Sequence, residues 1–249
     1  MKYMRVDCAE CKGIENCPPS GYFSTRKELD GREYEVWVKC SKRERLETEL
    51  RYKKALRLSG IPIAYWDKNF ANFEEGQNKK AIQKIQEFLR ERRWKEGKGL
   101  LLVGPVGAGK THLAAAIVHE LSKQDVFVLF VFVADLLDAL RETYDAEYEE
   151  QENLFDLVRE ARVLVLDDLG TEKISEWTIE KITQILNYRY NNKLSTIVTT
   201  NLVPQELRRR IGERAFSRLM GMCEVIPIVG EDWRLKNAFP NLKNKKGGE

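Results

Sequence analysis

The chain has 249 residues, of which 43% are apolar and 33% are charged, and its formal net charge is +3. This length suits one domain of ordinary size with a small appendage. The net charge is close to neutral, so the overall charge gives no evidence for a nucleic-acid partner. No apolar run approaches the roughly 18 residues of a membrane span, and the N-terminus lacks the apolar centre of a signal peptide. We therefore expect a cytoplasmic protein without a membrane partner.

Four cysteines near the N-terminus predict a small metal-binding module. Cys8 and Cys11 form a CxxC pair, and Cys17 and Cys40 follow. Four thiolates make a tetrahedral Zn²⁺ site with no open position, so the metal would be structural. The Asp-Gly pair at 30–31 is a hairpin signal, and the returning strand would bring Cys40 back to the pair. The alternatives are free cytosolic thiols or a redox CxxC, and we favour zinc.

An amphipathic helix is predicted for residues 41–58, and it ends before Gly60 and Pro62. We interpret it as the linker between the cysteine module and the rest of the chain. A second helix is predicted for 78–94, where Ile82, Ile85 and other apolar residues recur at helical spacing.

The sequence GPVGAGKT at 104–111 matches the phosphate-binding pattern GxxxxGK[ST]. An apolar run of strand length precedes it and a helix-forming segment follows, which is the context that the motif requires and a chance turn lacks. The Lys110 ammonium can reach the β- and γ-phosphates, and the Thr111 hydroxyl can bind Mg²⁺. We therefore expect ATP to contact Gly104, Pro105, Val106, Gly107, Ala108, Gly109, Lys110, Thr111 and His112. The aromatic residues before the second helix either wall an adenine pocket or belong to the core, and they are Tyr65, Trp66, Phe70 and Phe73.

A second nucleotide signature follows further along the chain. The continuous apolar run at 126–133 is typical of a strand buried on both faces of a parallel sheet. The run at 163–168, VLVLDD, ends in two carboxylates, as a Walker B strand does. Asp167 would hold Mg²⁺ through its water shell, and Asp168 would activate the attacking water. A helix-capping pair is the alternative, and the upstream phosphate loop argues against it.

The strand predicted for 195–200 ends at Asn201. Because ligands lie at the carboxyl ends of such strands, its amide could bind the γ-phosphate or the attacking water, although it could also cap the next helix. That helical region carries arginines at 208–210, and Arg214 and Arg218 lie four residues apart on one face. A last strand and a polar tail follow, and the tail contains Arg234.

The segments GPVGAGKT, VLVLDDLG, TIVTTN, GERAFSRL and EDWR, in this order, resemble the bacterial AAA+ helicase-loader family. That family includes the DnaC and DnaI loaders and the related IstB transposition helpers. The resemblance implies an α/β, parallel-sheet P-loop NTPase with a vestigial lid, here carrying a small N-terminal zinc module. It also implies that Asn201 is a sensor, that Arg218 is an arginine finger acting on a neighbouring subunit, and that Arg234 is a second sensor.

The resemblance further implies a replicative DNA helicase, single-stranded DNA and further copies of the chain as partners. Family members contact single-stranded DNA through a helical insertion between the Walker motifs, but here the matching stretch at 144–152 carries five acidic residues. These would repel phosphate, so Phe132, Lys193 or the arginines at 208–210 are the better candidates for DNA contact. A solvated surface or a subunit interface is the alternative role for the arginines.

These features predict a zinc module and linker helix at 1–58, an ATPase domain at 59–229 and a polar tail at 230–249. The predicted function is an ATP-hydrolysing helicase loader with ATP, Mg²⁺ and structural Zn²⁺ as cofactors. The alternatives are an IstB-like transposition or phage accessory ATPase, and a nucleotide-binding adaptor with little turnover.

Overall fold

The computed structural model describes residues 22–29, 32–39, 52–74, 76–142 and 148–233. The chain divides into two compact units, Met1–Lys54 and Ala55–Glu249. In the first unit, strands β1 (Tyr22–Leu29) and β2 (Arg32–Lys39) pair antiparallel, which confirms the predicted hairpin. The four cysteines of the predicted zinc site lie outside the described residues. Residues 41–51 of the predicted linker helix lie outside them as well.

The second unit is built on a five-stranded parallel sheet in the order β4-β5-β6-β3-β7. Its strands are β3 (Gly99–Val103), β4 (Val128–Phe132), β5 (Val163–Asp167), β6 (Ser195–Thr200) and β7 (Cys223–Pro227). The three central strands β5, β6 and β3 are almost wholly buried. The run at 126–133 was predicted to be buried on both faces, but its strand β4 lies at the edge of the sheet, and Val131 and Phe132 are only partly buried. Because all strands run the same way, their carboxyl ends meet at one edge of the sheet.

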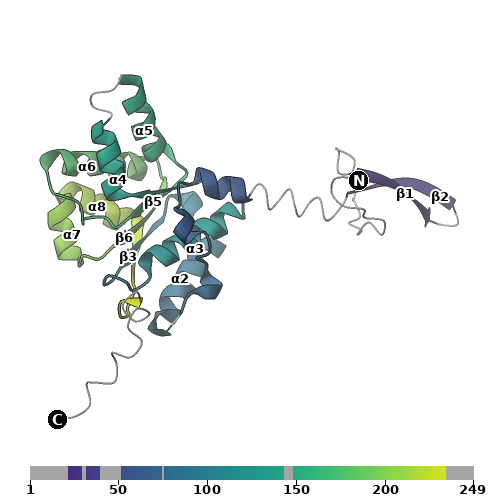
Figure 1. Ribbon diagram of the computed structural model, residues 1–249, viewed down its shortest axis with the longest axis horizontal. Coiled ribbons are helices and arrows are strands. Elements are labelled where there is room, and N and C mark those ends of the chain that lie inside the picture. Colours follow the sequence, from purple (N-terminus) through teal and green to yellow (C-terminus); the bar gives the residue numbers. More distant parts are fainter. Residues whose placement is uncertain (1–21, 30–31, 40–51, 75, 143–147, 234–249) are drawn as a thin grey trace, which may run out of the picture. The chain divides into compact units, whose positions relative to one another are not determined.

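Helices cover both faces of this sheet (Figure 1). They are α2 (Lys79–Arg90), α3 (Lys110–Ser122), α4 (Val133–Glu142), α5 (Tyr148–Glu160), α6 (Glu176–Asn191), α7 (Pro204–Ile211) and α8 (Glu213–Met222). Figure 1 shows α2 and α3 on one side of the sheet and α6 and α8 on the other. On the side of α6 and α8, Leu101, Leu164 and Val198 of the sheet pack into one apolar core with α4 to α8. Among the described residues, no helix is long and apolar enough to cross a membrane.

The first residues of the second unit, 55–60, lie at one edge of the sheet. Residues 52–58 are helical, and Leu56 is buried. The backbone N–H of Phe130 in β4 donates a 2.6 Å hydrogen bond to the carbonyl of Ser59. Gly60 follows with a φ of 77°, and a Cβ there would lie 2.9 Å from the carbonyl oxygen of Phe130. The chain after the predicted linker helix therefore reaches the sheet edge at Ser59, whose carbonyl accepts a hydrogen bond from the edge strand β4.

Two predicted segments differ from the structure in extent. The helix predicted for 78–94 ends at Arg90, because Arg92 takes a left-handed φ of 55° and a separate 3₁₀ turn, η5 (Arg93–Glu96), follows. The arginine-rich region is two helices, since Gly212 between α7 and α8 has a φ of 84° that breaks the helix.

Candidate nucleotide site

The phosphate-binding loop joins the end of β3 to the start of α3. Gly107 and Gly109 have φ values of 74° and 95°, which side-chain-bearing residues rarely adopt. Gly104 is needed for a different reason, because a Cβ there would lie 2.0 Å from the carbonyl oxygen of Ile228. Since Gly109 is the N-cap of α3, the loop leads directly into a helix N-terminus, which favours bound anions.

Lys110 and Thr111 lie in the first turn of α3, and their side chains bind to different partners. The Lys110 ammonium is largely buried and donates a 2.8 Å hydrogen bond to the carbonyl of Pro105, across its own loop. The Thr111 hydroxyl donates a 3.0 Å hydrogen bond to Oδ2 of Asp167 at the end of β5. The two nucleotide motifs, 56 residues apart in the chain, thus meet through their side chains.

Asp167 is held from two sides at the carboxyl edge of the sheet. Its second oxygen, Oδ1, accepts a 2.6 Å hydrogen bond from the Thr199 hydroxyl. Burial raises the pKa of Asp167, and the hydrogen bonds from Thr199 and Thr111 oppose that rise. A carboxylate and a hydroxyl at the entrance to a phosphate loop are hard oxygen ligands of the type that Mg²⁺ prefers. The donor set therefore fits a magnesium ion.

Asp168 begins the turn that follows β5. Its φ of 60° is left-handed, and its backbone N–H donates a 2.9 Å hydrogen bond to the Thr199 hydroxyl. The Thr171 hydroxyl lies 3.1 Å from its Oδ2 atom. The side chain is exposed, so this carboxylate lies where water reaches it.

Asn201 follows the end of β6, beside the ends of β3 and β5. Its Oδ1 atom is buried and has no hydrogen-bond partner among the residues that the structure describes. A buried amide oxygen without a partner costs free energy, and such groups are found at functional sites. The helix-capping alternative has no support, because the N-cap of α7 is Val203.

A cavity of about 850 Å³ opens beside the loop. Its floor is formed by 107–112, one wall by the segment between 64 and 78, and the other by 229–233. Of the aromatic residues before α2, Tyr65 and Phe73 line the cavity, whereas the indole N–H of Trp66 donates to the carbonyl of Ile61. The amide side chain of Asn78 ties the two walls together, donating to the carbonyl of Val229 and accepting from its N–H at 2.7 and 2.9 Å.

A family model described as IstB-like ATP binding protein matches residues 35–240. The chain belongs to this family. The IstB-like chain is also 25% identical to the replicative helicase loader DnaI of Bacillus subtilis, across 92% of this chain and 78% of the relative. It is 29% identical to the replicative helicase loader DnaC of Escherichia coli K12, across 79% of this chain and 81% of the relative.

Among solved structures, the crystal structure of the DnaC helicase loader is similar to the IstB-like chain with a TM-score of 0.62 and 35% identity. The similarity covers 68% of this chain and 100% of the chain in the DnaC structure. These findings confirm the resemblance to the bacterial AAA+ helicase-loader family, and the five-stranded parallel sheet with its P-loop is the fold of those ATPases.

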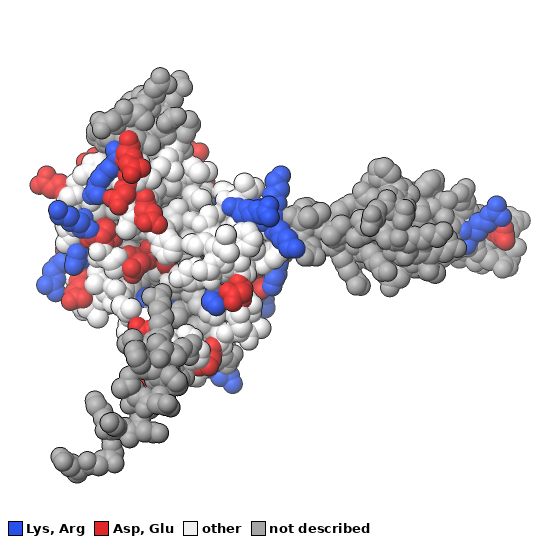
Figure 2. All heavy atoms as spheres, viewed as in Figure 1, with Lys and Arg blue, Asp and Glu red and all other residues white. Residues whose placement is uncertain are grey.

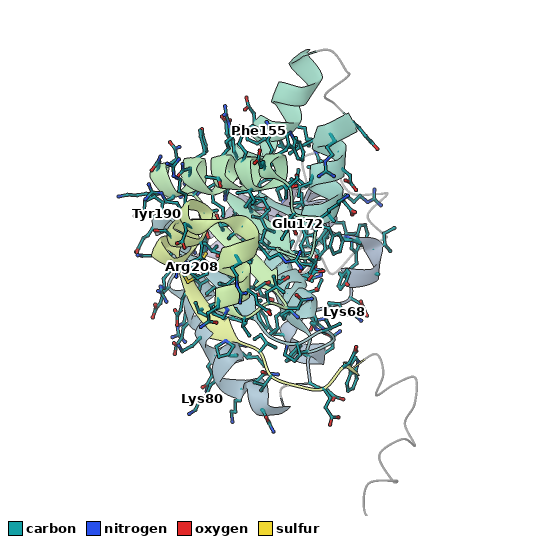
Figure 3. All side chains as sticks on the ribbon, turned by 90° about the vertical axis from the view of Figure 1, so that its left-hand side faces the viewer. Lys68, Lys80, Phe155, Glu172, Tyr190 and Arg208 are labelled. Carbon is teal, nitrogen blue, oxygen red and sulfur yellow. The ribbon has the colours of Figure 1, made fainter. Side chains whose placement is uncertain are left out.

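Arg218 lies on α8, away from the phosphate loop of its own chain. Its guanidinium donates from Nε to Oδ1 of Asn187 at 2.9 Å and lies 4.8 Å from the ring centre of Tyr190. Figure 3 shows Tyr190 and the cavity-lining Lys68 on opposite sides of the unit. Arg218 is partly exposed, as is Tyr190, so a neighbouring molecule could reach it. The second predicted arginine, Arg234, lies outside the described residues.

The residues proposed for DNA contact lie in dissimilar surroundings. Phe132 is partly buried against Phe130, with ring centres 5.5 Å apart, and Lys193 is exposed in the turn after α6. Among the arginines of α7, Arg208 donates to Glu213 at 2.6 Å, and Arg210 lies 3.5 Å from the carbonyl of Glu172. On the face drawn in Figure 2, acidic and basic residues are mixed on one side of the larger unit, basic residues gather on its other side, and a broad uncharged area lies between them.

Two contacts at the site were not predicted from the sequence, namely those of Thr199 and of the His112 side chain. Thr199 bonds both to the Asp167 carboxylate and to the Asp168 backbone. His112 was predicted to contact nucleotide, and its imidazole is directed to Asn69 and Asn72 of the cavity wall. The polar end of β6, with two threonines before Asn201, was the available signal for Thr199. For His112 the only signal was its position directly after the motif.

Proposed function

We propose that this protein is an ATP-dependent helicase loader, which binds and hydrolyses ATP while acting on a replicative helicase and single-stranded DNA. The observation that carries the ATPase part is the 3.0 Å hydrogen bond between Thr111 and Asp167, because it joins the phosphate loop to the carboxyl edge of the sheet. The loader part is supported by the relatives named DnaI and DnaC.

Each residue at the site has a distinct part in this proposal. The loop N–H groups and the Lys110 ammonium bind the phosphates, and Thr111 and Asp167 hold the magnesium ion. The ion, when bound, neutralises charge that develops on the phosphate oxygens. Asp168 accepts a proton from the attacking water, and the buried amide of Asn201 orients that water or the γ-phosphate.

Turnover in this proposal needs a second copy of the chain. Arg218 reaches the nucleotide of the neighbouring subunit as an arginine finger, and Arg234 acts as a second sensor within its own subunit. The exposure of Arg218 and its support by Asn187 and Tyr190 favour this arrangement, because a guanidinium held at the surface needs little reordering to meet a partner.

The N-terminal module in this proposal binds structural zinc through Cys8, Cys11, Cys17 and Cys40 and docks onto the helicase. A second candidate function is an IstB-like accessory ATPase of transposition or of a phage, which the family match favours. A third, a nucleotide-binding adaptor with little turnover, differs only in the rate of hydrolysis.

Two measurements test the proposal. The first is steady-state ATP hydrolysis with and without single-stranded DNA, comparing the wild-type chain with Lys110→Ala and with Lys123→Ala, which removes an exposed lysine from the far end of the α3 region. Lys110→Ala should abolish hydrolysis because it can no longer bind ATP, and Lys123→Ala should leave hydrolysis unchanged. The second is capture of purified replicative helicase by the immobilised chain. ATP binding with no measurable turnover would favour the adaptor, and no capture of helicase at about 10 μM would argue against a loader.

A further inference from the structure

The imidazole of His112 connects the phosphate loop to the wall of the nucleotide cavity. Its Nε2 atom lies 2.9 Å from the carbonyl oxygen of Asn69 and 3.1 Å from Oδ1 of Asn72. Both partners are acceptors, and Asn72 Oδ1 also accepts from the Asn69 backbone N–H, which agrees with its assignment as the oxygen. The hydrogen of the ring is therefore on Nε2, and His112 donates to both residues.

The turn that receives this hydrogen bond is rigid in itself. It is η3 (Phe70–Asn72), and its N-cap Asn69 and last residue Asn72 form a reciprocal capping box. The Asn72 amide also donates a 2.6 Å hydrogen bond to the carbonyl of Asp67. A single attachment point can thus fix the position of the whole turn.

The residue after the turn touches the phosphate loop directly. The Phe73 ring meets the His112 ring edge-on, with centres 5.1 Å apart and planes at 82°. It also lies against Gly109, where an added Cβ would be 2.6 Å from Phe73 Cε2. Lys68, Asn72 and Phe73 line the same cavity as the loop. The position of this wall, and so the width of the cavity, depends on how the turn is attached to α3.

We propose that His112 is a positioning residue that fixes the cavity wall formed by residues 69–73 to the phosphate loop. Its position sets how much more tightly the site binds a nucleoside triphosphate than the triphosphate group alone. This inference rests on the proposed binding of ATP at the loop. His112 acts through the wall, since its ring nitrogen is directed to Asn69 and Asn72. Loss of the imidazole should therefore weaken nucleoside contacts and leave phosphate contacts in place.

The experiment compares two ligands that share the phosphates. Dissociation constants for ATP and for inorganic tripolyphosphate are measured by calorimetry on the full chain, for wild type, His112→Ala and His112→Gln. Removing one hydrogen-bonded anchor should weaken ATP binding by about 3- to 10-fold and leave tripolyphosphate binding within about 2-fold. His112→Gln should restore most of the ATP affinity, because its amide N–H can reach the same acceptors.

A second variant keeps the test independent of the fold of α3. Asn72→Ala leaves the histidine in place and removes one acceptor together with the capping box, so it should also weaken ATP more than tripolyphosphate. Lys123→Ala, at the other end of the same helix region, is the control and should change neither constant.

Three results would overturn the inference alone, and a fourth would overturn the proposed function as well. Equal losses for ATP and tripolyphosphate would show that His112 supports the loop or the fold in general. An unchanged ATP affinity in His112→Ala would show that the wall does not depend on it. A wild-type chain that binds tripolyphosphate and ATP equally tightly would show that the wall adds nothing, whereas a wild-type chain that binds neither would refute the proposed function itself and this inference with it.

Discussion

The hydroxyl of Thr111 donates a 3.0 Å hydrogen bond to the carboxylate of Asp167, which in turn accepts a 2.6 Å hydrogen bond from Thr199. Three elements therefore meet at one carboxylate, namely the start of α3, the end of β5 and the end of β6. Burial raises the pKa of Asp167, and the two hydroxyls favour its charged form. The carboxylate is thereby held in place, and the two hydroxyl donors limit the rise of its pKa.

Thr199→Val should impair the magnesium-dependent step. Valine has the same shape but cannot donate, so Oδ1 of the buried Asp167 loses its partner and the pKa of Asp167 rises further. We expect turnover of ATP with Mg²⁺ to fall by about 10-fold, and nucleotide binding measured in EDTA to stay unchanged. Thr199→Ser, which keeps the hydroxyl, is the matched control. Equal turnover of the valine and serine variants would contradict this role.

The two nucleotide motifs were predictable because each is a local pattern. A phosphate loop needs glycines, a lysine and a hydroxyl within eight residues, and a Walker B strand needs an apolar run that ends in carboxylates. The strand bounds agree with the apolar runs to within two residues, since the run at 126–133 contains β4 (Val128–Phe132), and β6 was predicted without error at Ser195–Thr200. The hairpin was readable for the same reason, since its turn signal lies between two alternating segments.

The contacts that complete the site depend on how distant segments meet. Thr199 reaches Asp167 because β5 and β6 pair with Leu166 opposite Val198, which places the next residues of both strands side by side. No local pattern fixes that register. His112 and Asn69 are 43 residues apart, and the turn at Asn69 is too short for helical or strand periodicity to identify. The hydrogen bond between Ser59 and Phe130 at the sheet edge could not be predicted either, because the two residues are equally remote in the chain.

Arg218→Ala should bind nucleotide as the wild type does and lose turnover by about 1,000-fold, the lower range known for arginine fingers. The physical reason is that the guanidinium stabilises charge formed only in the transition state. Arg90→Ala, which removes an exposed arginine from the end of α2, is the control.

Mixing variants tests whether this arginine acts between subunits. Arg218→Ala retains an intact phosphate loop, and Lys110→Ala retains an intact Arg218. If the finger is supplied by a neighbour, a mixture of the two inactive variants should recover part of the wild-type turnover. No recovery in mixtures that demonstrably co-assemble would mean that Arg218 acts elsewhere.

Glu224 should make stability depend on pH in the acid range. This residue of β7 accepts hydrogen bonds from Lys84 of α2 at 2.8 Å and from Arg93 of η5 at 3.0 Å, and these partners lower its pKa below 4.5. A lowered carboxyl pKa stabilises the folded state above the unfolded pKa, and this stabilisation is lost as the pH falls through the folded pKa.

The corresponding experiment is urea unfolding of wild type and Glu224→Gln between about pH 7 and pH 3. The wild type should be the more stable at pH 7, and the difference should shrink below about pH 4.5 as Glu224 takes up its proton. Glu120→Gln, which breaks the exposed ion pair with Lys123 within the α3 region, serves as control. A difference that is the same at every pH would show that the ion pairs are not its cause.

Metal analysis of the purified chain should find about one zinc per molecule if four thiolates form a closed site. Cys8→Ser should lower that content, because a hydroxyl does not replace a thiolate ligand. Cys223→Ala should leave it unchanged, since Cys223 is buried in β7 and its thiol donates to the carbonyl of Thr196 at 3.3 Å. A chain purified without zinc, or equal loss from both variants, would refute the predicted site.

Arg189 should be among the most sensitive positions for stability. Its side chain is fully buried, and burial lowers the pKa of Arg189 to about 9, which still leaves the guanidinium charged at neutral pH. It donates to the hydroxyl of Thr196 and to carbonyls at the end of α5 and the start of β6, which belong to Val158, Arg159, Ala161 and Ser195. The guanidinium therefore satisfies the last carbonyls of α5 and attaches that helix to the sheet.

Replacing this arginine should leave those carbonyls buried without donors. We expect Arg189→Met to lower the free energy of unfolding by about 3–5 kcal/mol, and Arg189→Lys to recover little of it, because one ammonium cannot reach acceptors spread around a planar fork. Arg209→Met, at an exposed position of α7, should change it by less than about 0.5 kcal/mol. Urea unfolding gives the free energies, and hydrogen exchange should show the end of α5 opening first in both Arg189 variants. Full recovery by lysine would mean that charge alone, rather than the directed set of donors, holds α5 in place.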